Sequence, residues 1–224
     1  MIKGILFDAA DVFYRRAEST DAFASRLLAE GGFATSLAPA ARAHLEGLHL
    51  QASKGVVGHE EYWDAYLQAH GVGPAERRAA MVKQISGHAN AVQAIPGAHE
   101  SVKALKQRGF LIGIVTDTIY PLSWKMGWLA RAGVAEFVDV VSCSSELGFK
   151  KPEPAIYLDA VRRAGLTVPE AAFVGHDAGE LAGARAAGLA TVAVLYDHDA
   201  QADYYATTLM DLLDVPIFQA GRAW

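Results

Sequence analysis

The sequence predicts an α/β fold in which a doubly wound parallel sheet forms the core and an all-helical cap is inserted into it. Two observations support this prediction. Short apolar runs alternate with helical patterns along most of the chain, as in a parallel sheet with helices on both faces. This rhythm stops between about residues 16 and 94, where only helical patterns occur. We therefore expect a core formed by residues 1–15 and 95–224 and a cap formed by residues 16–94.

The predicted strands are short and rich in Val, Ile and Phe. Such runs are typical of central strands that are buried on both faces of a parallel sheet. They cover Ile2–Asp8, Phe110–Thr116, Val138–Cys143, Ala171–Gly175 and Ala190–Leu195.

Helical patterns separate these strands, and each of those in the core is followed by a glycine where a helix C-cap is expected. In the core they cover Ala98–Arg108, Pro121–Ala132, Glu153–Ala164 and Glu180–Ala187. In the cap they cover Thr20–Glu30, Pro39–Ala52, Glu60–Ala69 and Glu76–Ser86. A helical insert after the first strand is a candidate lid over an active site.

Reactive side chains stand where the predicted strands end. They are Asp8 after the first run, Thr116 and Asp117 at the end of the second, and Lys150 and Lys151 after the third. Ligands bind at the carboxyl ends of parallel strands, so we expect these groups to converge with the acids of VGHDAGEL (174–181). Such a set suits phosphoryl transfer. The carboxylate attacks phosphorus, the hydroxyl and ammonium groups bind phosphate oxygens, and the remaining acids bind Mg²⁺.

Composition narrows the class of protein further. Apolar residues make up 52% of the chain and charged residues 20%, which is typical of a globular protein. The net charge is −5 and no basic cluster occurs, which argues against nucleic-acid and membrane partners. The single cysteine, Cys143, cannot form an internal disulfide, and the N-terminus lacks a signal-peptide pattern. We expect a cytoplasmic protein, monomer or homodimer, that acts on a small molecule.

Four motifs along the chain resemble those of the haloacid dehalogenase-like (HAD) superfamily. They are ILFDAADV (5–12), GIVTDT (113–118), GFKKPEP (148–154) and FVGHDAGELAGARAAG (173–188). The resemblance covers nearly the whole chain and implies a Rossmann-like core with a helical cap after the first motif.

The resemblance also implies roles for individual residues. Asp8 matches the nucleophile that becomes an aspartyl phosphate, and Thr116 matches the hydroxyl that binds the phosphoryl group. Asp117, next to it, is placed with Thr116 among the substrate-binding residues. Lys151 matches the lysine that neutralises nucleophile and phosphate, with Lys150 as the alternative. The implied cofactor is Mg²⁺.

The first motif departs from the family pattern. Phosphatases of the family carry a second aspartate two residues after the nucleophile, where it transfers protons to and from the reacting groups. Here that residue is Ala10, and the loss of a general acid/base costs about 10²–10⁴ in rate. Ala10 keeps only its carbonyl, which the resemblance places on Mg²⁺. Asp11 points in another direction and is retained as a candidate catalytic acid.

The fourth motif also departs from the pattern. His176 stands where the family usually has an acid, and Mg²⁺ prefers oxygen ligands. The expected metal ligands are therefore Asp8, the Ala10 carbonyl, Asp177 and Glu180. The first hypothesis is a Mg²⁺-dependent phosphatase that acts on a small phosphorylated metabolite through an aspartyl phosphate.

Two other hypotheses follow from the alanine. Phosphonoacetaldehyde hydrolase, one branch of the superfamily, has Ala at the position of Ala10 and uses a cap lysine to form a Schiff base. Lys54 lies in the cap loop QASKGVVG (51–58), so carbon–phosphorus cleavage through Lys54 is the second hypothesis. A catalytically impaired binding or regulatory protein is the third. Dehalogenation ranks below these, because the expected Tyr after the nucleophile and the Ser-Asn pair are missing.

Overall fold

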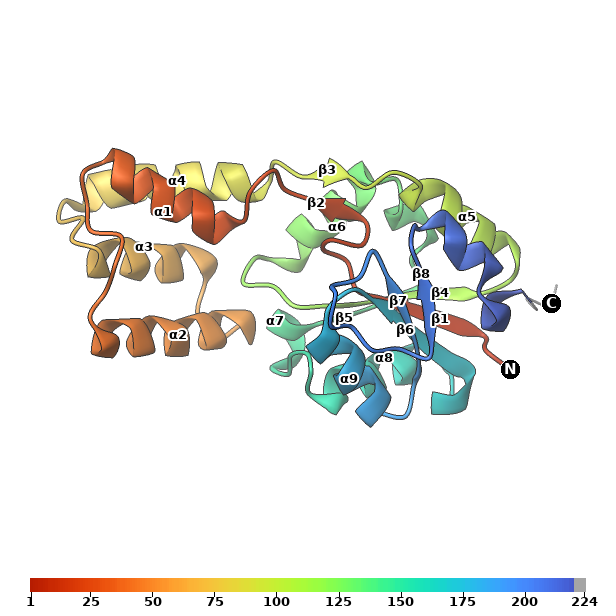
Figure 1. Cartoon of the computed structure of the whole chain (residues 1–224). Coiled ribbons are helices and arrows are strands. Elements are labelled where there is room, and N and C mark those ends of the chain that lie inside the picture. Colours follow the sequence, from red (N-terminus) through yellow and green to blue (C-terminus); the bar gives the residue numbers. More distant parts are fainter. Residues whose placement is uncertain (220–224) are drawn as a thin grey trace.

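A computed structural model describes residues 1–219 and shows a core built on a parallel sheet, with a helical cap at one end (Figure 1). Within these residues the main sheet has six strands, and all neighbouring strands are parallel. In spatial order they are β5 (Val140–Cys143), β4 (Leu111–Thr116), β1 (Gly4–Phe7), β6 (Ala171–Gly175), β7 (Ala190–Val194) and β8 (Tyr204–Ala206). The strand that carries Asp8 therefore lies in the middle of the sheet.

Alternation along the strands sends side chains into two separate hydrophobic cores. On β1, Phe7 packs on one face of the sheet with residues of α5 (Ala98–Gln107) and α6 (Leu122–Arg131). Leu6 packs on the opposite face with residues of α8 (Pro154–Arg163) and α9 (Ala178–Ala186). The predicted α/β fold, a parallel sheet flanked by helices, is confirmed.

Shorter elements complete the core. A single turn, α7 (Ser144–Leu147), follows β5, and 3₁₀ turns occupy η1 (Ala135–Phe137), η2 (Val168–Glu170), η3 (Met210–Asp214) and η4 (Pro216–Phe218). Residues 220–224, which the sequence assigned to the core, lie outside the described residues. No helix within residues 1–219 is long and apolar enough to cross a membrane.

The cap contains the four helices that the sequence predicts for it. They are α1 (Thr20–Glu30), α2 (Pro39–Ser53), α3 (His59–Ala69) and α4 (Ala75–Ala89). Ser19 caps α1 by accepting a hydrogen bond from the Ala22 amide. Trp63, Leu67 and Ile85 are buried among these helices, so the cap has a hydrophobic core of its own.

A two-stranded ribbon joins the cap to the core, and the sequence did not predict it. β2 (Tyr14–Arg15) pairs antiparallel with β3 (Gln93–Ala94), where the predicted domain boundaries fall. The expectation that residues 16–94 hold no strand is therefore wrong at its last two residues. Strands this short carry no periodic pattern, and β8 was missed for the same reason.

Two glycine substitutions test how tightly α9 packs on the turn before α8. A Cβ at Gly183 would lie 2.6 Å from the carbonyl oxygen of Pro152, so we expect Gly183→Ala to destabilise the protein by about 1–3 kcal/mol. Gly127 on α6 has no atom within 4 Å of such a Cβ, so Gly127→Ala should stabilise by up to ~1 kcal/mol. The urea unfolding midpoints of the two variants and of wild type measure these effects. Equal midpoints for Gly183→Ala and wild type would contradict the close packing of α9.

Candidate active site

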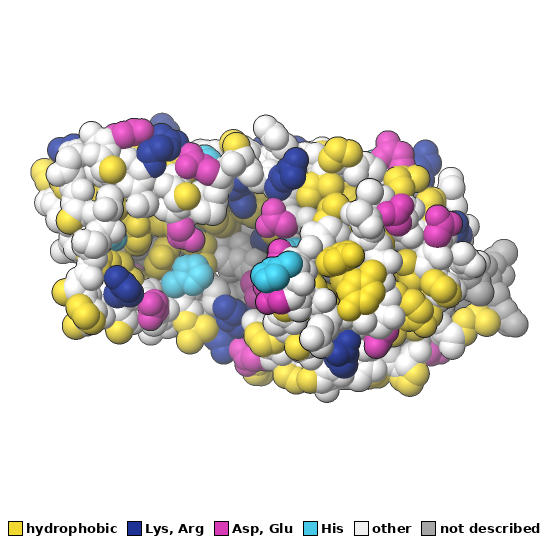
Figure 2. Space-filling model, viewed as in Figure 1, with side chains coloured by type: hydrophobic (Ala, Val, Ile, Leu, Met, Phe, Trp, Pro, Cys, Tyr) yellow, Lys and Arg dark blue, Asp and Glu magenta, His cyan; other side chains and the backbone are white. Residues whose placement is uncertain are grey.

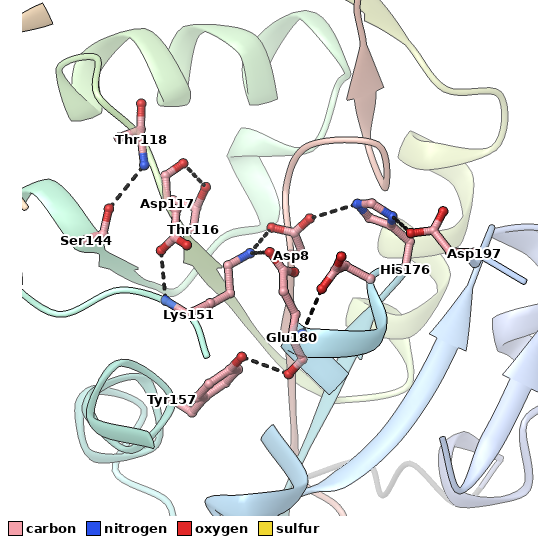
Figure 3. Close-up of polar contacts among 11 residues, drawn as sticks. Asp8, Thr116, Asp117, Thr118, Ser144, Lys151, Tyr157, His176, Glu180 and Asp197 are labelled. Carbon is pink, nitrogen blue, oxygen red and sulfur yellow. Dashed lines mark hydrogen bonds and ion pairs between the residues drawn. The ribbon is translucent and has the colours of Figure 1, made fainter. Parts of the chain in front are cut away.

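A buried ion pair lies at the carboxyl end of the sheet. Asp8 directly follows β1, and the Lys151 side chain reaches it from the turn before α8. Lys151 Nζ donates to Asp8 Oδ1 and lies 2.8 Å from Glu180 Oε1 (Figure 3). Burial alone would lower the pKa of Lys151, but the two carboxylates outweigh it and hold this pKa above its ordinary value. The structure thus brings Lys151, and not Lys150, to Asp8.

Thr116 and Asp117 end the neighbouring strand β4. Thr116 is buried, and its hydroxyl donates only a long bond of 3.5 Å to the Asp117 carbonyl. A bond of this length leaves the donor largely unused. Asp117 Oδ1 accepts from the Lys151 amide at 3.1 Å, and burial raises the pKa of this carboxyl. Asp117 therefore holds the lysine turn beside β4.

Glu180, in the first turn of α9, carries an unsatisfied oxygen. Its Oε1 faces Lys151, while its Oε2 is buried and has no hydrogen-bond partner in the described structure. Burial and the nearby charge of Asp8 raise the pKa of Glu180 to about 7, although Lys151 acts in the opposite direction. A buried, unpartnered carboxylate oxygen is costly, so it needs a cation or a donor that a ligand would bring.

The two residues before α9 differ in what they contact. His176 lies between two acids, with Nε2 3.9 Å from Asp8 Oδ2 and Nδ1 3.6 Å from Asp197 Oδ2. Asp177 is the N-cap of α9, where its Oδ1 accepts from the Glu180 amide at 2.9 Å. Because this contact occupies one Asp177 oxygen, its predicted role as a metal ligand stays a prediction.

A pocket of about 380 Å³ opens between the cap and this end of the sheet, and Figure 2 shows charged side chains around the hollow. Ala10 and Asp11 line it, next to Asp117 from the neighbouring strand end. Asp11 adopts a left-handed backbone conformation with φ of 56°, which is uncommon for a residue other than glycine. The catalytic role predicted for Asp11 remains a prediction.

Lys54, in the cap, pairs with an acid of the core. Its Nζ lies 2.9 Å from Glu153 Oε1, across the junction between the cap and the core. Among the described residues, it is not part of the pocket lining, whereas Lys150 is. The substrate-binding role of Lys54 stays a prediction.

Sequence reasoning missed much of the pocket wall. The residues missed include Tyr14, Arg16, Tyr120 and Lys125. From the cap, Trp63 Nε1 donates to Tyr120 Oη at 3.1 Å. The spacing of Lys125 and Trp128 on one predicted helix face was a usable signal, but a helical lysine usually lies in solvent.

The carboxylates near Asp8 are the candidate ligands for Mg²⁺, the cofactor that the resemblance implies. Within residues 1–219, no group of three or more His, Cys, Asp and Glu side chains is arranged to hold a metal ion. However, Mg²⁺ is often held by one or two carboxylates, with waters and substrate phosphate completing its octahedron. Asp8 and Glu180 supply two carboxylates, and the free Glu180 Oε2 needs a cation. The residues therefore fit Mg²⁺.

The fold and the site together point to a capped α/β hydrolase. The core is doubly wound, and a buried aspartate–lysine pair lies at the ends of its strands. The model of the haloacid dehalogenase-like hydrolase family matches residues 2–188, so the chain belongs to this family. The resemblance inferred from the four motifs is confirmed, and the protein is a hydrolase of this superfamily.

Named relatives and a solved structure agree with this membership. The chain is 30% identical over 204 residues to glyceraldehyde 3-phosphate phosphatase of Methanopyrus kandleri, covering 87% of this chain and 84% of the relative. It is 27% identical over 124 residues to phosphoglycolate phosphatase of Nitrosococcus oceani, covering 52% and 54%. The 2-haloacid dehalogenase of Pseudomonas syringae superposes with a TM-score of 0.69 at 22% identity, covering 98% and 99%. This last likeness shows the fold alone.

The raised pKa of Glu180 predicts how stability depends on pH. Because this pKa rises from 4.5 to about 7 on folding, the folded state binds the proton more tightly, and Glu180 opposes folding as pH rises through that value. We expect Glu180→Gln to gain stability relative to wild type between about pH 5 and about pH 8. Thermal midpoints at both pH values test this. The exposed Glu60→Gln is the control, and a gain for Glu180→Gln that does not grow with pH would contradict the assignment.

Proposed function

We propose that the protein is a Mg²⁺-dependent phosphatase that hydrolyses small phosphorylated metabolites through a phosphoaspartate on Asp8. The observation that carries this proposal is the contact of the buried Lys151 with Asp8 and Glu180 near the Thr116 hydroxyl, at the end of the sheet where Ala10 and Asp117 line a pocket. Family membership and relatives named as phosphatases support it.

The geometry supports two displacement steps at phosphorus. In the first, an Asp8 carboxylate oxygen attacks phosphorus, the ester P–O bond breaks, and the alcohol oxygen leaves with the electron pair and takes a proton from water. In the second, water attacks the phosphorus of the phosphoaspartate. Its proton passes to solvent, inorganic phosphate leaves, and the Asp8 carboxylate is restored.

Surrounding residues stabilise the charge that develops on the phosphoryl oxygens. Lys151 already neutralises Asp8, and its ammonium group lies where it also faces a phosphoryl group bound there. The weakly used Thr116 hydroxyl is a donor for another phosphoryl oxygen. Asp8, Glu180 and the Ala10 carbonyl would hold Mg²⁺, which supplies Lewis-acid stabilisation of the phosphoryl oxygens when bound.

The setting proposed for this activity is the cytoplasm. The free Cys143 is buried, which suits a reducing compartment. The proposed partner is the small-molecule substrate, without nucleic acid or membrane, and the protein acts as a monomer or a homodimer.

Replacing the nucleophile is the direct test of this proposal. We expect purified protein with Mg²⁺ to hydrolyse p-nitrophenyl phosphate, and Asp8→Asn to lower kcat by about 10³-fold or more, because an amide cannot form the phosphoaspartate. The exposed Asp214→Asn is the control. Absence of Asp8-dependent turnover would overturn the proposal and favour a binding or regulatory protein.

The alanine at position 10 predicts a gain of function. Ala10 lines the pocket, and without an acid there the enzyme should favour leaving groups that need no proton, such as p-nitrophenolate. We expect Ala10→Asp to raise kcat for alkyl phosphates by about 10²-fold or more, with a much smaller change for the aryl ester. Equal effects on both ester classes would rule out proton transfer as the missing element.

A further inference from the structure

Lys125 is a buried cation in the pocket wall. It lies on α6, is 5% exposed and lines the pocket that Ala10 also lines. Its Nζ is 5.4 Å from the centroid of the Trp128 ring and 5.8 Å from that of Tyr14. Among the described residues, no carboxylate forms an ion pair or a hydrogen bond with this ammonium group. Aromatic faces attract a cation but do not replace a counter-ion.

A second cation lies on the same ring. The guanidinium carbon of Arg16 is 4.6 Å from the Trp128 centroid, and Arg16 also lines the pocket. Its Nε donates to the Ala89 carbonyl at 2.8 Å, which anchors the side chain at the end of α4. Two cations therefore border one indole in a partly closed cavity, and like charges so placed repel unless an anion lies near both.

The acids of the pocket are occupied elsewhere or do not contact this pair of cations. Glu18 forms an ion pair with Arg26 at 2.6 Å, and Asp117 accepts from the Lys151 amide. Asp11 and Asp21 also line the pocket, but neither pairs with Lys125 in the described structure. Within the described residues, no carboxylate therefore forms an ion pair with either cation on the Trp128 side of the pocket.

The pKa of Lys125 bears on whether its side chain is charged in the pocket. Burial, together with the charges of Lys151 and Arg16, lowers the pKa of Lys125 to about 8, although Asp8 acts in the opposite direction. Near neutral pH the ammonium form still predominates, so the pocket presents a charged group. A buried charge without a partner destabilises a protein unless a ligand supplies the partner.

We propose that Lys125 and Arg16 form a second anion-binding site of the pocket, which receives an anionic group of the substrate while its phosphoryl group lies at Asp8. This inference rests on the proposed phosphatase function and names its substrate class. The substrates are phosphate monoesters that carry a second anion, such as a carboxylate, rather than esters of neutral alcohols.

The test compares substrates that differ in one charge. The pairs are phosphoglycolate with hydroxyethyl phosphate, and phosphoglycerate with glycerol phosphate. We expect wild type to prefer the acid of at least one pair by about tenfold or more in kcat/KM. Lys125→Met should abolish this preference mainly by raising KM for the acid, while KM for the neutral ester changes less than about twofold.

Control variants distinguish loss of the anion-binding site from a general loss of stability or activity. Lys103→Met removes an exposed lysine from α5 and should leave the preference unchanged. Lys125→Met keeps most of the length of the side chain and removes a buried charge, so its thermal midpoint should not fall below that of wild type. Lys125→Arg should retain part of the preference, because it keeps the charge.

Failure of the subsite is distinguishable from failure of the phosphatase. Asp8-dependent hydrolysis of p-nitrophenyl phosphate with no preference for either acid would overturn the subsite and leave the phosphatase intact. Without turnover, calorimetric titration of phosphoglycerate into wild type and Lys125→Met tests the subsite directly. Weaker binding by Lys125→Met alone would support it, and equal binding by both would overturn it.

Discussion

The site depends on one buried lysine that faces two carboxylates. Lys151 neutralises Asp8 and contacts Glu180, so three charged side chains from three separate segments meet at the end of the sheet. Burying such a group is tolerated only when its geometry is held firmly. Asp117 fixes the Lys151 amide, and Gly183 lets α9 approach Pro152 closely. The fold around β1 therefore acts as a frame for this charge arrangement.

The same arrangement explains why a cation and a phosphoryl group suit the site. Two carboxylates face one ammonium group, and one carboxylate oxygen of Glu180 has no partner. A bound Mg²⁺ would supply the missing positive charge, and the phosphoryl oxygens would then meet both cations. Ala10 contributes no side-chain charge here, so in the proposed phosphatase this position would supply no proton to a leaving group.

Sequence reasoning located the core of the site because parallel strands place their ends together. Asp8, Thr116 and Lys151 each follow a recognisable strand or motif, and in the structure Lys151 contacts Asp8 while Thr116 is buried at the end of the neighbouring strand. Lys125 and Arg16 escaped notice because their importance depends on burial against Trp128, which no local pattern encodes. The substrate-binding role of Lys54 was inferred from its place in a cap loop. Its ion pair with Glu153 depends on how the cap lies on the core, which the local sequence does not encode.

The ribbon between cap and core has a mechanical consequence. The chain enters the cap through β2 and leaves it through β3, and these strands are hydrogen-bonded to each other. The two crossings are therefore tied together, so any movement of the cap relative to the core would bend both at once. Arg16 directly follows β2, whereas Lys125 belongs to the core. Such a movement would change the spacing of the two cations, and in the proposed subsite it would link the binding of a substrate's second charge to the position of the cap.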